Sequence, residues 1–445
     1  MSKYLSIEPD WFDQPQAADP LERRTWARIE INAAGRTATR LWDRISQAER
    51  SPIYIPAFPL AEWLVNHWWA LLYEPLRGKE IPTADRCEHR QERAWLQRHC
   101  LRAADSGLLL SRLCFHSDGR GVVLQWFADD FESYPRMPGQ FTGSGCVNFT
   151  VGEVEIGLRD FVSRVIQRID GDVDIRAVKL QAQWAAIRNA APDEAAFCRT
   201  AGRLGLDPYC LEEWPVGLSD LVESAASDAS DQPLVSDFFE AAEPEMATDT
   251  WQWLKTASQK FDLHQAPPLG TMKLFTAGSP DKTGYKLARI VRTELRATGR
   301  LEISSAAAPL RIPMLSFENF NHLPSSRVRA VVGWQNGKQP TLAGPRPKRA
   351  DNARFLEARS LFHAAISCSR GPRLVSAAYT WDQPASRAFA AELLAPQAKL
   401  AERFGSHVGA DDVDERLTTL ATEYQVSPKV IRHQLDNAGV DLGDD

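Results

Sequence analysis

Hydrophobic and polar residues alternate over the first part of the chain, in the period-two pattern of half-buried β-strands. Residues 28–42, RIEINAAGRTATRLW, contain two such runs around a turn at Gly35, which predicts a β-hairpin. A second hairpin is predicted around Asp118-Gly119. Between them, residues 51–75 predict a short strand followed by a helix from about Leu60 to Tyr73.

The pattern then changes from strand to helix. Residues 146–169, CVNFTVGEVEIGLRDFVSRVIQRI, begin as a strand and continue with apolar residues at helical spacing. The apolar side of this predicted helix is formed by Ile156, Leu158, Phe161, Val162 and Val165. Residues 1–175 are therefore predicted to form one α+β domain.

Residues 176–265 have helical spacing and an acidic composition. Between Asp207 and Thr250 there are twelve Asp or Glu residues and no Lys or Arg. A run of like charge is typical of a solvated face, and a contact with a basic partner is the alternative. We expect an acidic helical region that links the N-terminal domain to a third part, residues 266–445.

This third part begins with a basic amphipathic segment, GYKLARIVRTELRATGR, residues 284–300. On a helical wheel its cations share an arc of about 120° opposite the apolar residues; they are Lys286, Arg289, Arg292, Arg296 and Arg300. A surface helix is favoured here over an anion-binding face. Overall the sequence predicts an α+β protein with a mixed N-terminal domain, a helical middle region and a mainly helical C-terminal domain with a small sheet.

Composition narrows the class of protein. Hydrophobic residues make up 44% and charged residues 25% of the 445 residues, as in ordinary globular proteins. The net charge of −6 argues against nonspecific nucleic-acid binding by the whole molecule. Seven cysteines without CxxC spacing favour reduced thiols, and the N-terminus lacks the apolar run of a signal peptide. We expect a cytoplasmic protein with no membrane segment.

Candidate chemistry is concentrated in two segments, ARFLEARSLFHAAIS at 353–367 and ASRAFAAELLAP at 385–396. Their order and residues resemble the zinc metallopeptidases of the ImmA/IrrE family, in which an Arg-Phe-x-x-Ala-His-Glu-x-x-His helix precedes a helix ending in Phe-Ala-Ala-x-Leu-Leu-x-Pro. The resemblance covers about residues 270–440 in element order. In the intact motif two His one helical turn apart bind Zn²⁺, and the Glu between them is the general base toward the bound water.

This chain departs from the motif at most of the functional positions. Arg359 stands at the first ligand position and Ser360 at the general-base position. Only His363 matches a ligand, whereas Ala385 stands at the third-ligand position and Arg387 replaces an Asn. A guanidinium cannot ligate zinc, and neither Ser360 nor Ala385 supplies the missing base or ligand. We therefore expect no intact catalytic group and no cofactor. His363 is interpreted as a helical histidine satisfied by local hydrogen bonds.

A rebuilt metal site is the alternative. It would combine His363 with Asp382 and His407, and zinc would then be the cofactor. Asp382 is otherwise expected to cap the following helix. Glu392 lies about 10.5 Å further along the helix axis than Ala385, which is too far for the same metal, and Cys368 points off the face of His363.

The two arginines suggest a second alternative. Arg359 and Arg387 could line a cleft that attracts carboxylates, phosphates or nucleotides. Structural ion pairs with Glu357 or Glu392 are the favoured interpretation of both residues.

Residues 415–440 have a helix-turn-helix pattern, with Ser427-Pro428 starting the second helix. A DNA reader needs polar and basic residues facing outward from that helix. The available ones are Lys429, Arg432, His433, Gln434 and Asn437. Acidic flanks, GADDVDE and DLGDD, favour a packing role over DNA recognition.

The leading hypothesis is a catalytically inactive relative of the ImmA/IrrE peptidases. Since intact members cleave or antagonise helix-turn-helix repressors in mobile elements and stress responses, the resemblance implies a regulatory or phage-defence protein that binds a protein partner, such as a helix-turn-helix regulator. The rival hypotheses are an active metallo-endopeptidase with a rebuilt site and a DNA-binding transcriptional regulator.

Overall fold

The computed structural model describes residues 4–12, 14, 16–83, 90–129, 138–227, 232–261, 279–320, 325, 327–367, 371–405 and 413–442. The chain divides into two compact units, Met1–Ser230 and Asp231–Asp445. Helices and β-sheet occur in both units, so the protein belongs to the α+β class, as the hydrophobic pattern predicts. The division between the units falls inside the acidic helical region expected at 176–265.

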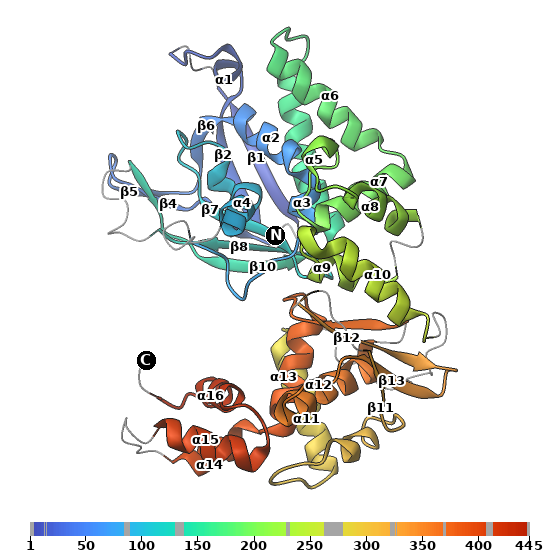
Figure 1. The fold of residues 1–445 in the computed structure, drawn as a ribbon. Coiled ribbons are helices and arrows are strands. Elements are labelled where there is room, and N and C mark those ends of the chain that lie inside the picture. Colours follow the sequence, from blue (N-terminus) through green and yellow to red (C-terminus); the bar gives the residue numbers. More distant parts are fainter. Residues whose placement is uncertain are drawn as a thin grey trace. The chain divides into compact units, whose positions relative to one another are not determined.

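Small antiparallel sheets form the strand layer of the first unit (Figure 1). Its strands are β1 (Leu5–Trp11), β2 (Trp26–Ala33), β3 (Arg36–Thr37), β4 (Leu41–Asp43), β5 (Ala48–Arg50), β6 (Ile53–Pro56), β7 (Arg112–Ser117), β8 (Val122–Phe127), β9 (Gly139–Phe141) and β10 (Gly145–Phe149). The strand orders are β1-β2-β3 with β6 also on β2, then β5-β4-β9, and β10-β8-β7.

Both predicted hairpins are present in the first unit. β2 and β3 meet at Ala34 and Gly35, whose φ angles of 50° and 78° are left-handed and suit glycine best. β7 and β8 pair across a turn in which the Asp118 carboxylate accepts from the backbone N–H of Gly121 at 2.8 Å. The first hairpin is shorter than predicted, because Leu41–Asp43 pairs with β5 and β9 instead.

Helices cover these strands. They are α1 (Pro20–Arg24), α2 (Ala57–Asn66), α3 (Trp68–Tyr73), α4 (Arg90–His99), α5 (Val151–Arg168), α6 (Ile175–Asn189), α7 (Pro192–Arg203) and α8 (Leu218–Ser227), with 3₁₀ turns η2 (Leu101–Ala103) and η3 (Leu211–Glu213). α5 begins with a capping box in which Thr150 and Glu153 bond each other's backbone N–H. Gly157 lets α5 approach β1 closely, because a Cβ there would stand 2.2 Å from the Leu5 carbonyl oxygen.

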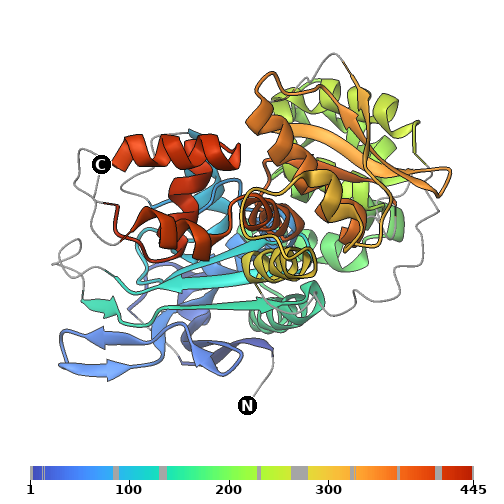
Figure 2. The ribbon, with the colours of Figure 1, turned by 90° about the horizontal axis from the view of Figure 1, so that it is seen from below.

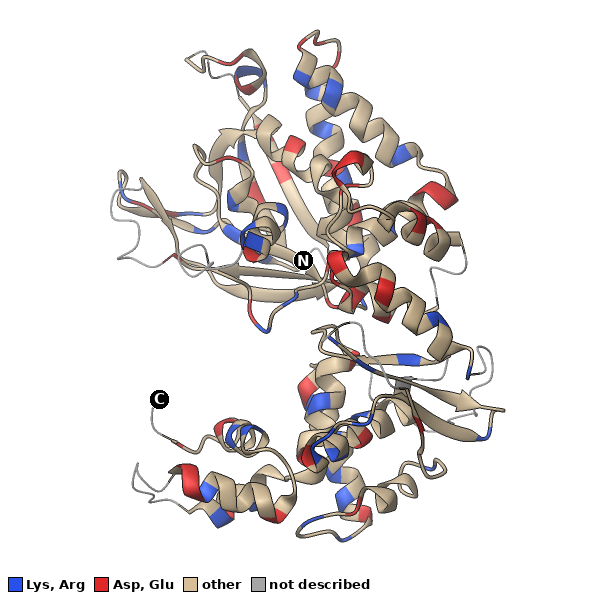
Figure 3. Cartoon of the chain, viewed as in Figure 1, with Lys and Arg blue, Asp and Glu red and all other residues tan. Residues whose placement is uncertain are grey.

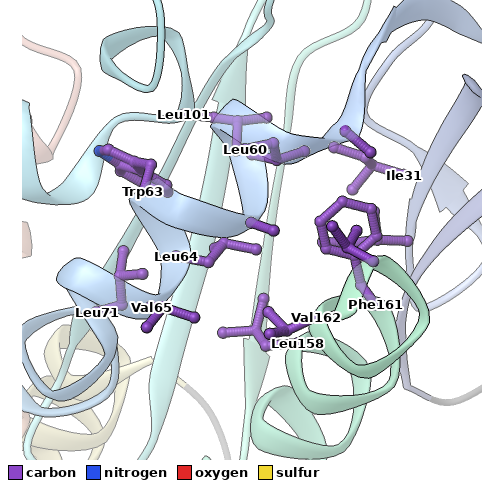
Figure 4. Packing of buried hydrophobic residues seen from close by; sticks show 14 of the residues in the cluster. Ile31, Leu60, Trp63, Leu64, Val65, Leu71, Leu101, Leu158, Phe161 and Val162 are labelled. Carbon is purple, nitrogen blue, oxygen red and sulfur yellow. The ribbon is translucent and has the colours of Figure 1, made fainter. Parts of the chain in front are cut away.

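The apolar faces of α2 and α5 pack together in the core (Figure 4). Leu60 and Leu64 of α2 lie in one cluster with Leu158 and Phe161 of α5. Two details of the prediction are wrong. Ile156 is 60% exposed, and the helix expected at 60–73 is interrupted at His67, which separates α2 from α3.

The second unit is mainly helical around one sheet. Its helices are α9 (Pro233–Ala241), α10 (Ala247–Ser258), α11 (Pro280–Glu294), α12 (Ala350–Phe362), α13 (Asp382–Leu394), α14 (Gln397–Phe404), α15 (Val413–Tyr424) and α16 (Pro428–Asn437), with 3₁₀ turns η4 (Pro244–Met246) and η6 (Ile303–Ala307) and a π-helical turn η7 (His363–Ser367). Its strands are β11 (Ser316–Asn319), β12 (Val328–Gln335), β13 (Gln339–Gly344) and β14 (Arg373–Ser376). The strand order is β11-β13-β12-β14, and only the β11–β13 pair is parallel.

A close helix contact organises this unit. α11 packs on α13 through Gly284, where a Cβ would stand 2.2 Å from the Ala385 carbonyl oxygen. α12 also packs on α13, with the Phe362 and Phe389 rings 5.8 Å apart. The terminal helices α14, α15 and α16, drawn in red in Figure 2, pack against one another.

The predicted basic arc of residues 286–300 is wrong in its extent. α11 ends at Glu294, and Arg296 has a left-handed φ of 52°, so Arg296 and Arg300 do not continue the helix. Arg292 is buried and donates to the carbonyl oxygens of Leu393 at 2.5 Å and Gly299 at 2.6 Å. Lys and Arg are spread over several elements of each unit (Figure 3).

Candidate functional site

The two motif segments form neighbouring helices, as predicted. Residues 350–367 are α12 and its π-helical turn, and residues 382–394 are α13. Leu361, Phe389, Leu393 and Leu394 are buried in the core of this unit, whereas Phe355 is only partly buried.

Arg359 is buried and lies between α12, α13 and β14. Its Nε donates to Ser386 Oγ at 3.1 Å, and its Nη2 donates to the Ser376 carbonyl oxygen at 2.8 Å and to Gln383 Oε1 at 2.7 Å. The side chain is 6% exposed, and burial lowers the pKa of Arg359 well below its ordinary value, with the like charges of Arg387 and Arg329 acting in the same direction. The expected ion pair with Glu357 or Glu392 is wrong, since every hydrogen-bond acceptor recorded for Arg359 is neutral.

The network around Arg359 is tightly connected. Gln383 also accepts from the Ser376 N–H at 2.9 Å and donates to the Leu374 carbonyl oxygen at 2.6 Å. Ser386 donates to the Gln383 carbonyl oxygen at 2.8 Å. The guanidinium therefore connects α12 to the start of α13 and to β14. The side chains of Gln383 and Ser386 that accept from it also form hydrogen bonds of their own with the backbone.

Ser360 and Ala385 are equally unsuited to catalysis. Ser360 is fully buried, and its hydroxyl donates to the Leu356 carbonyl oxygen at 2.8 Å, one helical turn earlier. A serine hydroxyl donated to the backbone in this way does not supply the general base that a Glu carboxylate would provide at this position. Ala385 is fully buried and carries no ligand atom.

His363 differs from our interpretation of it. It is fully buried at the point where α12 changes into the π-helical turn, and neither ring nitrogen has a hydrogen-bond partner among the described residues. The expectation that local hydrogen bonds satisfy it is therefore wrong within that part of the chain. Burial lowers the pKa of His363 well below its ordinary value, and nearby Arg373 has the same effect, so the imidazole is neutral.

The residues considered for a rebuilt metal site are occupied by other partners or lie outside the described residues. Asp382 Oδ2 lies 2.6 Å from Arg373 Nη2, and Arg373 also holds Asp237 of α9 with two contacts of 2.7 Å. Burial raises the pKa of Asp237, and its bidentate contact with Arg373 opposes that rise. His407 and Cys368 lie outside the described residues. Within the described ranges, no three His, Cys, Asp or Glu side chains are grouped so as to hold a metal ion.

Arg387 projects from the next turn of α13 and is partly buried. Its Cζ lies 4.8 Å from the centre of the Tyr379 ring, a cation–π contact. Burial lowers the pKa of Arg387, and no hydrogen bond or ion pair of Arg387 is recorded among the described residues. Of the two arginines proposed to bind an anion, only Arg387 reaches the surface, because Arg359 is enclosed by its own network.

Glu392 belongs to a different network, which joins four helices. It is 2% exposed and accepts from Arg289 Nε of α11 at 2.8 Å and from the Gln397 N–H of α14 at 3.1 Å. It also accepts from Gln434 Nε2 of α16 at 3.1 Å. Tyr285 of α11 donates to Gln434 Oε1 at 3.2 Å. The terminal helix pair is thus bound to the rest of its unit through buried polar groups.

The helix-turn-helix prediction is confirmed for the elements and partly wrong for the outward face. Ile431 and Leu435 are buried, but Gln434 is also fully buried and is therefore not an outward polar residue. Arg432 Nη2 lies 3.1 Å from Asp414 Oδ1 of α15. Lys429 and His433 are exposed on α16.

Side chains of α11 line a surface hollow with a volume of about 460 Å³. Its lining combines cations with apolar and neutral groups, namely Lys282, Tyr285, Lys286, Arg289, Ile290, Thr293 and Glu294. It is a shallow surface of α11 and does not include Arg359, His363 or Arg387.

The first unit contains a buried charge cluster that the sequence analysis missed. Glu74, 1% exposed, accepts from Arg98 at 2.7 and 2.8 Å and lies 2.9 Å from His99 Nε2. The other ring nitrogen of His99 lies 2.7 Å from the Phe115 carbonyl oxygen. The ring of His99 thus bridges the Glu74 carboxyl group and the backbone of β7. Burial opposes ionisation of Glu74, but Arg98 and His99 outweigh it and lower the pKa of Glu74 to about 2.

No protein-family model matches the chain, and the curated proteins contain no match to it. Among the described residues, no helix combines the length and the apolar character that crossing a bilayer requires.

Proposed function

We propose that the second unit is a catalytically inactive relative of the ImmA/IrrE metallopeptidases and that the protein acts by binding a protein partner in a regulatory or defence-linked role. The proposal rests on the resemblance of residues 353–396 to the peptidase motif. It is supported by one structural observation above all. At the first ligand position stands Arg359, a buried cation whose three hydrogen bonds all go to neutral groups of α13 and β14.

The positive charge of Arg359 opposes metal binding at this position. A buried guanidinium and a divalent metal ion at the same place repel each other strongly in a low-dielectric interior. The second ligand position retains His363, whose pKa is lowered chiefly by burial; the positive charges of Arg373 and Arg359 add to this, and Asp382 opposes it. What the motif region can do is hold α12, α13 and β14 together, which supports a role as a binding scaffold.

The alternatives make different demands on the same region. An active metallo-endopeptidase would need a metal held by His363 with ligands from outside the described residues, and zinc would be its cofactor. A DNA-binding regulator would use Lys429, Arg432 and His433 of α16. All three are basic residues with exposed or partly exposed side chains. Arg432 is already paired with Asp414.

The test is capture of partners and measurement of metal on one sample. The full chain, tagged and purified from its native lysate without chelators, is treated with nuclease and then examined for co-purifying proteins and for bound metal. We expect a protein partner that survives nuclease treatment and rebinds as a purified protein, with substoichiometric metal. A stoichiometric metal that disappears in a His363→Ala variant would support the peptidase instead. Loss of every partner after nuclease treatment would support the DNA-binding hypothesis.

A further inference from the structure

Two cysteines of the first unit face each other across an antiparallel bridge. Cys100 follows the end of α4, and Cys114 lies within β7; the two residues form an isolated antiparallel β-bridge. Residues paired in this way have Cα atoms about 4.5–5.5 Å apart, which is within the range that a disulfide spans. Both are free thiols, and their side chains interact directly with each other.

The backbones that carry the two thiols are fixed on both sides. His99, the residue before Cys100, bonds the carbonyl oxygen of Phe115, the residue after Cys114, at 2.7 Å. On the same strand the Ser117 N–H donates to the Glu74 carbonyl oxygen at 2.9 Å. Because the charge cluster of Glu74, Arg98 and His99 is attached to both backbones, the cysteines are held in register and little ordering entropy remains to be lost when they join.

The surroundings favour reaction at one of the two thiols. Cys100 is 7% exposed, whereas Cys114 is completely buried. The thiol contact with Cys114 lowers the pKa of Cys100 to about 7 against the effect of burial, and the guanidinium groups of Arg102 and Arg112 act in the same direction. A thiolate fraction is thus present near neutral pH at Cys100, the less buried of the two thiols.

We propose that Cys100 and Cys114 are a reversible oxidation site that takes a peroxide as oxidant and closes to an intramolecular disulfide. In the first step the Cys100 thiolate attacks a peroxide oxygen, the O–O bond breaks, and the thiolate becomes a sulfenic acid as hydroxide, then water, leaves. In the second step the Cys114 sulfur attacks the sulfenic sulfur, and water leaves with the thiol proton. Two thiols and one hydrogen peroxide thus give one disulfide and two waters.

Closure would join the end of α4 covalently to β7 beside the Glu74 cluster. The crosslink restricts the unfolded chain over residues 100–114, so the oxidised protein should unfold at a temperature higher by roughly 5 °C. This site lies in the first unit and does not depend on the function proposed for the second.

The experiment is peptide mapping of the full chain after mild oxidation. Reduced protein is treated with equimolar hydrogen peroxide, the remaining thiols are alkylated, and peptides are separated without reductant and identified by mass spectrometry. We expect one product in which the peptides of Cys100 and Cys114 are linked with loss of two hydrogens, and dithiothreitol should restore both thiols. Cys100→Ala and Cys114→Ala should each abolish the product. Cys210→Ala, which removes a thiol whose pKa is raised by burial, should not.

The wild-type map decides the matter even if a variant fails to fold. The proposal is overturned if both cysteines remain alkylated after peroxide treatment, if Cys100 stops at a sulfinic acid, or if either residue joins another cysteine. A linked product that leaves the unfolding temperature unchanged would overturn the conclusion that the crosslink stabilises the first unit.

Discussion

Replacing Arg359 should reveal whether its positive charge or its hydrogen bonds hold the motif region together. The pair of changes to compare is Arg359→Lys and Arg359→Met. Lysine keeps the charge but has a single ammonium on a flexible stem, which cannot reproduce the guanidinium fork that reaches Ser386, Ser376 and Gln383 at once. Methionine removes the charge and fills most of the same space.

The magnitudes follow from what each variant leaves behind. After Arg359→Met, Gln383 Oε1 still accepts from the Ser376 N–H, and Ser386 still donates to the Gln383 carbonyl oxygen. The Ser376 carbonyl oxygen loses the hydrogen bond that it accepts from Arg359. One unsatisfied buried group costs about 1–3 kcal/mol. Arg359→Lys keeps a fully buried charge with fewer hydrogen bonds, so a loss of about 3–5 kcal/mol is expected. The chemically conservative change should therefore be the more damaging one.

The assay is urea unfolding of the full chain followed by circular dichroism, with hydrogen exchange of α12 and α13 peptides to assign the change to the second unit. Arg387→Lys and Arg387→Met are the matched controls on α13. Both should change the free energy of unfolding by less than about 1 kcal/mol, because the contact found for Arg387 is a single cation–π pair with the exposed ring of Tyr379. If Arg359→Lys is tolerated better than Arg359→Met, the charge itself is stabilising. The argument from neutral partners would then be refuted.

Two further predictions concern acid stability and the terminal helices. Burial lowers the pKa of His67 to about 4, so below pH 6.5 the unfolded chain binds more protons at this residue than the folded chain. The free energy of unfolding should therefore fall by about 3 kcal/mol between pH 6.5 and pH 4, and urea unfolding of His67→Phe should show a smaller fall over that range. Glu74, with its pKa of about 2 against a usual 4.5, adds a loss of about 3 kcal/mol as the pH falls from 4.5 toward 2, which a Glu74→Gln variant should no longer show. Gln434→Ala should destabilise the second unit by about 2 kcal/mol, because it breaks buried bonds to Glu392 and the Ala395 carbonyl oxygen, whereas Arg432→Ala should cost less than about 1 kcal/mol. Binding to duplex DNA at physiological salt that is lost in Arg432→Ala would contradict a purely structural role for this helix pair.

Local sequence signals predicted the elements well where the physics is local. The hairpins at Gly35 and Asp118-Gly119 form because those residues accept the turn geometry, and the pairing of the strands follows. The break at His67 was missed because the apolar spacing continues through it from α2 into α3. The end of α11 was placed too late because the basic residues keep helical spacing beyond Glu294, although the chain turns at Arg296.

The candidate site was predictable in its location but not in its internal contacts. The motif positions of Arg359 and His363 could be identified from sequence, and the two helices that carry them are neighbours. The partners of Arg359 could not, because Gln383 and Ser386 are residue types that usually face solvent and nothing local marks them as buried. Glu74 could have been identified from the sequence. It directly follows the apolar run WWALLY, and a carboxylate buried at such a place needs a buried partner.

The central claim is that a scaffold built around the buried guanidinium of Arg359 stands in place of a metal site. The most direct test is the metal content of the chain. Protein purified from its native source without chelators is analysed for zinc, iron and manganese, alongside the His363→Ala variant. The account predicts substoichiometric metal that does not change in the variant, because Arg359 already holds a positive charge at the first ligand position. One metal ion per chain that is lost with His363 would contradict it.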